Sequence, residues 1–211
     1  MYKNFVKRLL DFLIALIALP FVLLVIMIMA PFIYFEDRGP IFYNATRRGK
    51  DGKNFKMFKL RSMYVNAPDL KNADGSTFNS ANDPRVTKIG KFMRKTSVDE
   101  LPQLLNVLIG DMSIIGPRPT LAKTPYEELP EISKKRLVAR PGITGYAQAY
   151  FRNSITQDEK FQHDCYYVEN ISFLLDVKIL IQTVASVLKR DNIYVSTEET
   201  PAEAKEPTEV K

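Results

Sequence analysis

The most uneven part of the hydrophobic pattern is an apolar run near the N-terminus, where residues 12–35 contain no charged side chain. A helix that crosses a membrane needs roughly 20 apolar residues, so this run is long enough to enter a bilayer. Pro20 lies near its middle and Pro31 near its end. Because proline removes a backbone donor and clashes with the preceding turn, we expect a bend at Pro20.

Basic residues flank the apolar run on both sides. Lysines and arginines collect at the cytoplasmic ends of membrane segments, so two basic flanks favour a helix that enters, bends and leaves by the same membrane face. A kinked single span with the rest of the chain in the cytoplasm remains an alternative. The flanking residues are Lys3, Lys7 and Arg8 before the run, and Arg38, Arg47, Arg48 and Lys50 after it.

The pattern after the run predicts short strands followed by helices. Residues 40–43 and 55–61 alternate apolar with polar groups, and the Gly- and Lys-rich residues 48–53 between them predict a hairpin turn. Residues 66–84 predict a surface loop. Leucines at helical spacing predict a helix over 101–108 that ends at Gly110, and an extended piece should follow over residues 111–119.

The C-terminal half predicts further helices. A charged helix is expected over 125–138, a turn over 140–145 and a helix over 156–168. Residues 171–189 predict an amphipathic helix, which could lie on lipid headgroups or pack on the core of the domain. The Glu-, Pro- and Thr-rich residues after 195 should be disordered.

The net charge of +6 indicates an anionic partner, which could be nucleic acid, anionic lipid or a phosphorylated substrate. The apolar run and the absence of a nucleic-acid-binding motif argue against nucleic acid. Cys165 and His163 are the only cysteine and histidine. An internal disulfide is therefore impossible, a His/Cys metal site is disfavoured, and catalysis should rest on carboxylates and basic groups.

Two adjacent carboxylates, Asp99 and Glu100, stand where the 101–108 helix is expected to begin. With Asp99 as N-cap, Pro102 falls in the first turn, where proline is tolerated. Both carboxylates would then feel the positive end of the helix dipole and stay ionised, as a nucleophile or metal ligand requires. Ser97 and Glu100 also match a capping box, so ordinary helix capping is an alternative explanation for the pair.

Basic residues surround this pair in the sequence. Arg94 and Lys95 precede it, and Arg118 follows between Pro117 and Pro119. Ionised carboxylates among cations could hold a divalent metal and a diphosphate, since Mg²⁺ takes oxygen ligands from carboxylates and substrate phosphates. A surface arginine in a tight turn is the alternative for Arg118.

Six segments taken together match one family pattern, and they cover most of the chain. The sequence resembles the bacterial sugar transferases, the small monotopic phosphoglycosyl transferases. The resemblance implies a helix-rich α/β cytoplasmic domain with one N-terminal re-entrant membrane helix and interfacial amphipathic helices. It implies a membrane helix with its basic flank over 1–36, a catalytic domain over 37–195 and a disordered acidic tail over 196–211. The matching segments are 7–12, 58–63, 83–104, 110–119, 140–145 and 164–176.

The resemblance also implies a reaction. Asp99 would attack the sugar-linked phosphate of a UDP-sugar, release UMP and carry the phosphosugar until polyprenyl (undecaprenyl) phosphate accepts it. Mg²⁺ would bind at Asp99 and offset the repulsion between anions, and Glu100 would assist. The residues expected near phosphate and nucleotide are Arg94, Arg118, Pro117, Pro119, Asp164, Lys59, Arg61 and Arg152.

The sequence departs from the family pattern in the membrane helix and near the expected substrate pocket. Leu19 precedes Pro20 where the family has serine, while Tyr146 and Phe151 replace a common Trp and Gly. The resemblance places the protein at the inner membrane, with its body on the cytoplasmic face, where it could work with downstream glycosyltransferases. A non-catalytic membrane adaptor of a glycan-assembly complex is the alternative.

Overall fold

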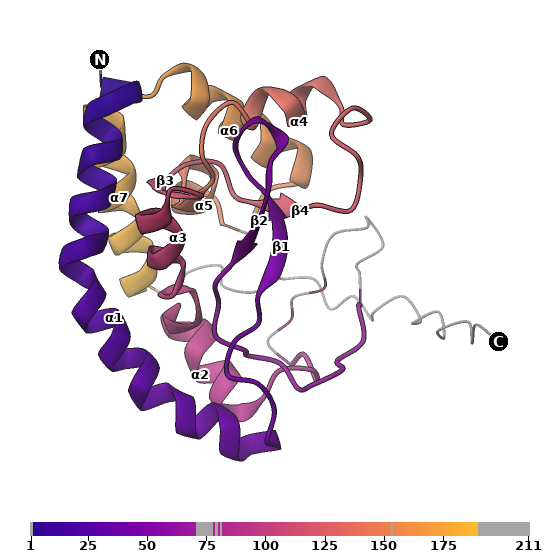
Figure 1. Ribbon diagram of the computed structural model, residues 1–211. Coiled ribbons are helices and arrows are strands. Elements are labelled where there is room, and N and C mark those ends of the chain that lie inside the picture. The colour runs from indigo at the N-terminus through magenta and orange to yellow at the C-terminus, as the bar shows by residue number, and fades with distance from the viewer. Residues whose placement is uncertain (1, 71–77, 79, 81, 153, 190–211) are drawn as a thin grey trace.

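One long helix, α1 (Lys7–Asp37), runs along the side of a helix-rich α/β body in the computed structural model (Figure 1). A single π-helical turn over Tyr2–Val6 precedes it. The structure describes residues 2–70, 78, 80, 82–152 and 154–189. The prediction of a disordered tail over 196–211 lies outside the described residues.

Helix α1 is continuous, and both Pro20 and Pro31 lie inside it. Its ribbon is straight at the N-terminal end and turns toward the body in its second half (Figure 1), as helix-internal prolines lead us to expect. One stripe of α1 faces the body, with Ala15 and Val22 fully buried. The opposite face exposes large apolar side chains, including Ile17 at 79%. The helix from Tyr2 to Asp37 is long and apolar enough to cross a membrane.

A three-stranded antiparallel sheet follows, in the order β2-β1-β4. Its strands are β1 (Ala45–Arg48), β2 (Asn54–Met57) and β4 (Thr120–Leu121). The predicted hairpin turn is confirmed, because residues Lys50–Gly52 form a 3₁₀ turn between β1 and β2. The strand predicted over 40–43 is wrong: only Phe42 forms a bridge, to Leu60, and the strand itself starts at Ala45.

A parallel pair, β3 (Ser113–Ile115) and β5 (Gly142–Thr144), forms a second sheet. Strand β3 confirms the predicted extended piece, but β5 occupies residues expected to form only a turn. Strand β5 forms because of a contact between distant segments. Gly116 and Gly142 approach so closely that a Cβ on Gly142 would lie 2.1 Å from the Gly116 nitrogen. This contact between distant segments draws residues 142–144 alongside β3.

Helix prediction succeeded where local sequence decides the helix ends. Gly110 ends α3 with φ +101°, and the Thr156 and Glu159 side chains form a capping box at the start of α6. The predicted 125–138 helix is limited to α4, and the pattern missed α2 and α5. The helices are α2 (Lys88–Thr96), α3 (Gln103–Ile109), α4 (Glu131–Arg136), α5 (Tyr146–Tyr150), α6 (Gln157–Glu169) and α7 (Phe173–Lys189).

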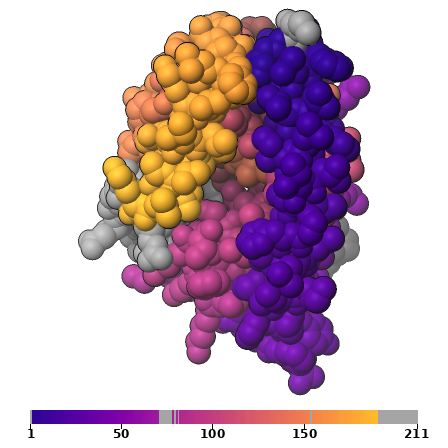
Figure 2. All heavy atoms as spheres, turned by 90° about the vertical axis from the view of Figure 1, so that its left-hand side faces the viewer, coloured from indigo at the N-terminus to yellow at the C-terminus, as the bar shows by residue number. Residues whose placement is uncertain are grey.

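Helix α1 is part of the hydrophobic core. Ala15 packs with Val107 and with residues of β2, while Met29 and Ile33 pack with Leu60 and Met93. Helices α1 and α7 lie on the same face of the molecule, indigo and yellow in Figure 2. The exposed side chains of α7 are also largely apolar, namely Phe173, Leu174, Leu180, Ile181, Val184 and Leu188.

Polar contacts tie the N-terminal end of α1 to the body. The Lys7 ammonium lies 2.8 Å from Asp176 Oδ2 at the start of α7. The Ser113 hydroxyl donates to Asp11 at 2.7 Å, and the Tyr167 hydroxyl donates to Asp176 at 2.8 Å. Buried ions are costly unless they are paired and hydrogen-bonded, so this network fixes where the end of α1 sits.

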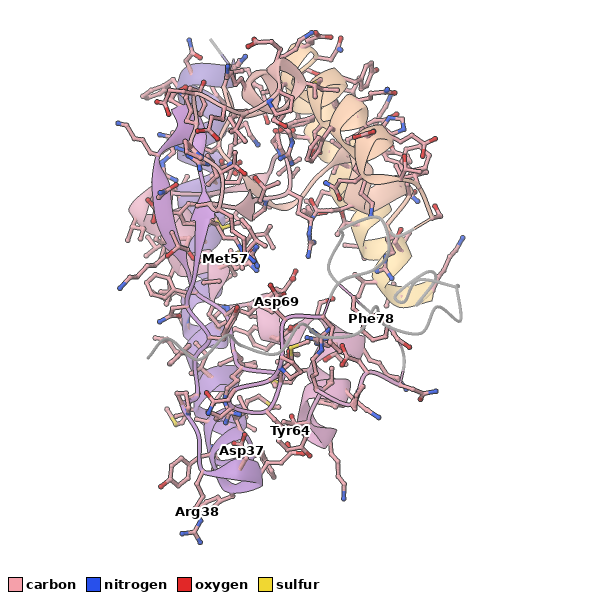
Figure 3. The ribbon with its side chains drawn as sticks, turned by 90° about the vertical axis from the view of Figure 1, so that its right-hand side faces the viewer. Asp37, Arg38, Met57, Tyr64, Asp69 and Phe78 are labelled. Atoms are coloured by element: carbon pink, nitrogen blue, oxygen red, sulfur yellow. The ribbon has the colours of Figure 1, made fainter. Side chains whose placement is uncertain are left out.

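The C-terminal end of α1 is tied to the body as well. Arg61 donates to both carboxylate oxygens of Asp37 at 2.6 Å, and Asp37 lies at the lower end of α1 in Figure 3. The Glu36 carboxylate accepts from the Lys88 backbone N–H at 2.5 Å. Glu36 therefore caps the first turn of α2. Both ends of the apolar helix thus bind the same body.

Candidate active site

Asp99 and Glu100 lie in a 3₁₀ turn, Val98–Glu100, that joins α2 to α3. The predicted capping roles are wrong. Ser97 has φ +56° and its side chain makes no capping bond, and Pro102, not Asp99, directly precedes α3. The backbone carbonyl of Asp99 instead accepts from the Leu60 N–H at 3.0 Å. This pairing with the segment after β2 sets the geometry of the turn and buries the Asp99 side chain.

Lys59 binds both carboxylates. Its Nζ lies 2.9 Å from Asp99 Oδ2 and 3.0 Å from Glu100 Oε1. Burial alone would lower the pKa of Lys59, but the charges of Glu100 and Asp99 outweigh burial and raise it. The positive charge beside the two carboxylates therefore comes from Lys59. The sequence had led us to expect it from the helix dipole.

A fully buried amide keeps Lys59 in this position. Asn106 of α3 accepts from the Phe58 N–H at 2.8 Å and donates to the Lys56 carbonyl at 2.8 Å. These two bonds fix the segment after β2 against α3, the helix that follows the carboxylate turn. Lys59 is thus placed by backbone contacts on both sides of it, rather than by its own ion pairs alone.

Two arginines complete the positive surroundings of Glu100. Arg118 Nη2 lies 4.0 Å from Glu100 Oε1, and the charge of Arg47 on β1 also acts on Glu100. Burial alone would raise the pKa of Glu100, but Lys59, Arg118 and Arg47 together lower it from 4.5 to about 2. Glu100 is therefore ionised at neutral pH. Strand register brings Arg47 here, because β1 pairs with β4, which begins two residues after Arg118.

Asp164 is buried and bound to Arg136, a residue that the sequence did not indicate. Arg136 donates to Asp164 Oδ2 from Nε at 3.0 Å and from Nη2 at 2.5 Å. Arg136 Nη2 also donates to the Arg118 carbonyl at 2.6 Å. Burial raises the pKa of Asp164 despite the opposing charge of Arg136. Asp164 is therefore connected to Arg118 through Arg136, and it also interacts with the Arg118 backbone and charge directly.

The remaining expected residues occupy different places. Arg61 uses all five of its N–H donors in hydrogen bonds to Asp37 and to the backbone carbonyls of Ile33, Pro40 and Met63. Arg94 lies in the last turn of α2, and its Nε donates to Ser62 Oγ at 3.0 Å. The Pro117 carbonyl accepts from the Gly142 N–H at 2.9 Å. Arg152 follows α5 with φ +50°.

An aromatic cluster borders α5 and α6. The Phe151 ring stacks on His163 at 4.3 Å between centroids, and Tyr146 contacts His163, Tyr150 and Tyr166. The single histidine thus lies among aromatic rings, and it contacts both Tyr146 and Phe151, which depart from the family pattern.

The donor set of the site suits a hard divalent ion that arrives with a phosphate. In the described part of the chain, no group of three or more His, Cys, Asp or Glu side chains could hold a metal ion. Asp99 and Glu100 offer two adjacent carboxylates, and Mg²⁺ commonly takes one or two carboxylates and completes its shell with phosphate and water. The residues therefore fit Mg²⁺ bound together with a substrate.

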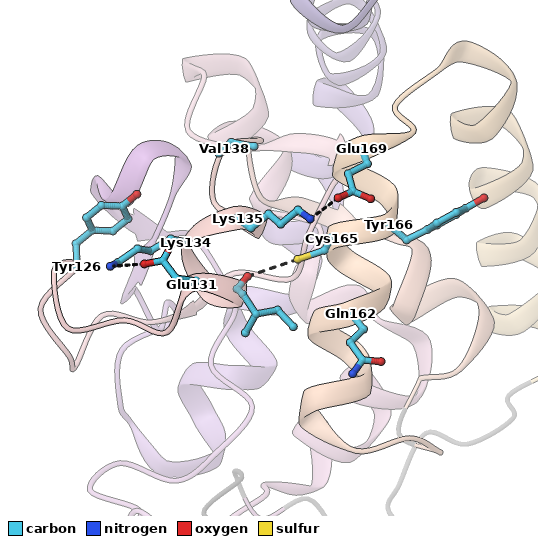
Figure 4. Close-up of a pocket in the computed structure, with 10 residues that line it drawn as sticks. Tyr126, Glu131, Lys134, Lys135, Val138, Gln162, Cys165, Tyr166 and Glu169 are labelled. Atoms are coloured by element: carbon cyan, nitrogen blue, oxygen red, sulfur yellow. Dashed lines mark hydrogen bonds and ion pairs between the residues drawn. The ribbon is translucent and has the colours of Figure 1, made fainter.

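A separate pocket opens between α4 and α6 (Figure 4). Lys135 forms an ion pair with Glu169 across it, and Cys165 Sγ lies 3.5 Å from the Ile132 carbonyl. Neither carboxylate of the site nor any of its three cations lines this pocket. Its lining residues include Tyr126, Glu131, Val138, Gln162 and Tyr166.

Comparison with known proteins gives consistent matches. The family model for bacterial sugar transferases matches residues 2–190. The chain is 42% identical over 190 residues to the galactosyl transferase CpsE of Streptococcus agalactiae, covering 86% of this chain and 42% of that protein. It is 40% identical over 190 residues to a protein of Aeromonas hydrophila, covering 87% of this chain and 44% of the relative. That relative is named UDP-N-acetylgalactosamine-undecaprenyl-phosphate N-acetylgalactosaminephosphotransferase.

The chain thus spans about two fifths of the length of these relatives. A shorter relative, the sugar transferase EpsL of Bacillus subtilis, is 40% identical over 190 residues, covering 89% of both chains. The apolar α1 and the family together point to association with a membrane. The chain belongs to the bacterial sugar transferase family.

Proposed function

We propose that this protein transfers a sugar 1-phosphate from a UDP-sugar to polyprenyl (undecaprenyl) phosphate, with Asp99 as the nucleophile. The observation that carries the proposal is the buried Asp99 carboxylate, which lies 2.9 Å from the Lys59 ammonium and next to Glu100, on which the charges of Arg118 and Arg47 act. The name of the Aeromonas hydrophila relative describes such a transfer to undecaprenyl phosphate, which supports the same reaction class here.

The reaction has two balanced steps. An Asp99 carboxylate oxygen attacks the phosphorus that bears the sugar, and the bond from that phosphorus to the bridging oxygen of the diphosphate breaks, so UMP leaves. A phosphate oxygen of the polyprenyl phosphate then attacks the same phosphorus, which releases the Asp99 carboxylate and forms the polyprenyl-diphosphate-sugar. One difficult exchange becomes two easier ones, and ping-pong kinetics are expected.

The neighbouring residues supply charge and orientation. Lys59 holds Asp99 and Glu100 in place and offsets the repulsion between the carboxylates and the incoming diphosphate. Arg118 and Arg47 add positive charge on the side of Glu100. Mg²⁺, held by Asp99 and Glu100 together with phosphate oxygens, would neutralise the developing charge on the leaving UMP. Glu100 stays ionised and positions these cations.

Helix α1 would serve as a re-entrant membrane helix, with α7 at the interface and the body on the cytoplasmic face of the inner membrane. Two observations support this arrangement. Both ends of α1 bind the same body, through Lys7 and Asp37. Helices α1 and α7, which both expose large apolar side chains, lie on one face of the molecule (Figure 2). Under this proposal, the membrane helix with its basic flank spans 1–36 and the catalytic domain spans 37–195.

The test is UMP release by purified protein from a panel of UDP-sugars, with Mg²⁺ and undecaprenyl phosphate. At least one donor should yield UMP, and Asp99→Asn should lower the rate by about 10³-fold or more, as removal of a nucleophile does. The matched control is Asp158→Asn, which replaces an exposed carboxylate of α6 and should keep full activity.

Mass spectrometry of the protein mixed with its donor, without lipid acceptor, should find a phosphosugar on Asp99. Equal turnover by Asp99→Asn would refute the mechanism, and a wild-type protein inactive toward all donors would favour an adaptor.

A further inference from the structure

Arg47 has a buried donor without an acceptor. Within the part of the chain that the structure describes, its Nε is buried and has no hydrogen-bond partner. A buried donor left unpaired costs about 1–3 kcal/mol, and most buried polar groups in proteins are paired. The unpaired Nε therefore indicates either strain or a partner that binds from outside.

Arg48, the next residue on β1, has a structural role that contrasts with Arg47. Arg48 donates to the Gly52 and Thr124 carbonyls, so it holds the hairpin to the loop that follows β4. Successive side chains of a strand point to opposite faces, and Arg47 accordingly faces the carboxylate site instead. Its electrostatic neighbours there include Arg118 and Glu100.

The charges around Arg47 do not balance without a further anion. Burial lowers the pKa of Arg47, and the like charge of Arg118 lowers it further. The carboxylate whose charge acts on both Arg47 and Arg118 is Glu100, and Lys59 already contacts it at 3.0 Å. An anion placed between the two guanidinium groups would satisfy the buried donor and remove the repulsion.

We propose that Arg47, together with Arg118, binds the diphosphate of the sugar donor through its non-bridging oxygens. This inference rests on the proposed function and adds a substrate-binding residue to it. A guanidinium offers two parallel donors that match phosphate oxygens, so the fork geometry as well as the charge should count. Since the donor of Arg47 is unpaired in the free protein, its role is in binding rather than in folding.

The decisive measurement compares thermal unfolding with and without UDP and Mg²⁺, using full-length protein in detergent. Without UDP, Arg47→Gln should unfold at the same temperature as wild type or higher, because an unpaired donor and a like-charge contact are removed. With UDP, the stabilisation seen for wild type should be largely lost. Lys56→Gln is the matched control: it removes one exposed cation from the adjacent strand and should respond to UDP as wild type does.

Kinetics give a second readout with the UDP-sugar that the wild type turns over. Arg47→Gln should lower kcat/KM by roughly 10- to 100-fold, since hydrogen bonds between charged groups are worth about that much. Arg47→Lys should recover only part of the loss. An Arg47→Gln protein that UDP stabilises as strongly as wild type would overturn the inference, as would a wild type that UDP does not stabilise at all. Undiminished turnover by Arg47→Gln would overturn it while leaving the Asp99 mechanism intact.

Discussion

The ammonium group of Lys59 lies 2.9 Å from Asp99 Oδ2, so the carboxylate proposed to attack phosphorus is ion-paired before any substrate arrives. The same ammonium contacts Glu100 at 3.0 Å. One cation therefore serves two adjacent anions that would otherwise repel each other. It also keeps the Asp99 side chain in one orientation, which lowers the entropic cost of reaching the attacking geometry.

Replacing Lys59 should cost more activity than replacing any other cation of the site. Lys59→Met leaves two adjacent carboxylates without their shared partner, and we expect a fall in kcat of about 10²-fold or more. Lys59→Arg should restore part of the lost activity. The positive charge returns, but a guanidinium cannot reproduce the contact of one compact ammonium group with both carboxylates. UMP release under saturating donor is the measurement. Full activity in Lys59→Met would contradict the role assigned to this contact.

Glu100 should make the stability of the protein depend on pH in a defined window. Its pKa is about 2 in the folded protein against an ordinary 4.5, so its contribution is fully present above pH 4.5 and is lost as the pH falls toward 2. Glu100→Gln removes this dependence. Wild type should be the more stable by about 1–3 kcal/mol at pH 6, a range that allows for partial solvent exposure.

Thermal unfolding of both proteins between pH 6 and pH 2 measures the Glu100 effect. The difference between the two unfolding temperatures should shrink steadily below pH 4.5. A difference that stays constant across this range would show that the ion pairs of Glu100 do not stabilise the fold.

The Arg136–Asp164 pair should act on catalysis through Arg118. Asp164→Asn weakens the hold of Arg136 on the Arg118 carbonyl, and we expect kcat/KM to fall by roughly tenfold to a hundredfold. If this effect passes through Arg118, then Asp164→Asn should cost little more in an Arg118→Ala background. A double-mutant cycle on kcat/KM, measured well below the unfolding temperature of each variant, tests this coupling. Fully additive losses would mean that Asp164 acts by another route.

Cysteine labelling tests the membrane arrangement. Cys165 is buried and serves as the single site to remove first. Asn4 precedes α1, Lys53 follows it, and both residues are exposed. Cysteines introduced at these two positions should react with a membrane-impermeant reagent from the same side of the membrane. A cysteine at Ile17, on the exposed apolar face, should be protected by lipid. Labelling of the first two positions from opposite sides would show a single span instead.

Local sequence predicted those parts of the fold that local interactions determine. The end of α3 at Gly110 and the start of α6 at Thr156 each depend on the backbone and side chain of a few neighbouring residues, so both were predicted correctly. Helix α2 was missed although Thr87 caps it locally, by accepting from the Gly90 N–H at 2.9 Å. Contacts with distant segments also fix where it begins. The Glu36 carboxylate of α1 caps its first turn, and Gly90 sits where a Cβ would lie 2.0 Å from the Ser62 carbonyl.

The site itself depends on pairings between distant residues, which no local pattern contains. Lys59 and Asp99 are brought together by Asn106 and by the Leu60 backbone. The capping box at Ser97 fits the sequence rule, but the positive φ of Ser97 prevents it. Arg47 and Arg136 read as ordinary basic residues in the sequence, because strand register and burial are what give them their partners.

The anchoring of α1 at both ends limits how this protein can be divided. Arg61, Ser113 and Asp176 all take partners from α1, and Leu60, next to Lys59, packs on Ile33. Deleting residues 1–37 to obtain a water-soluble protein would leave these groups without their partners and open the core beneath the carboxylate turn. Purification should therefore keep the hydrophobic helix and cover it with detergent, since the helix is a structural support for the turn that carries Asp99 and Glu100.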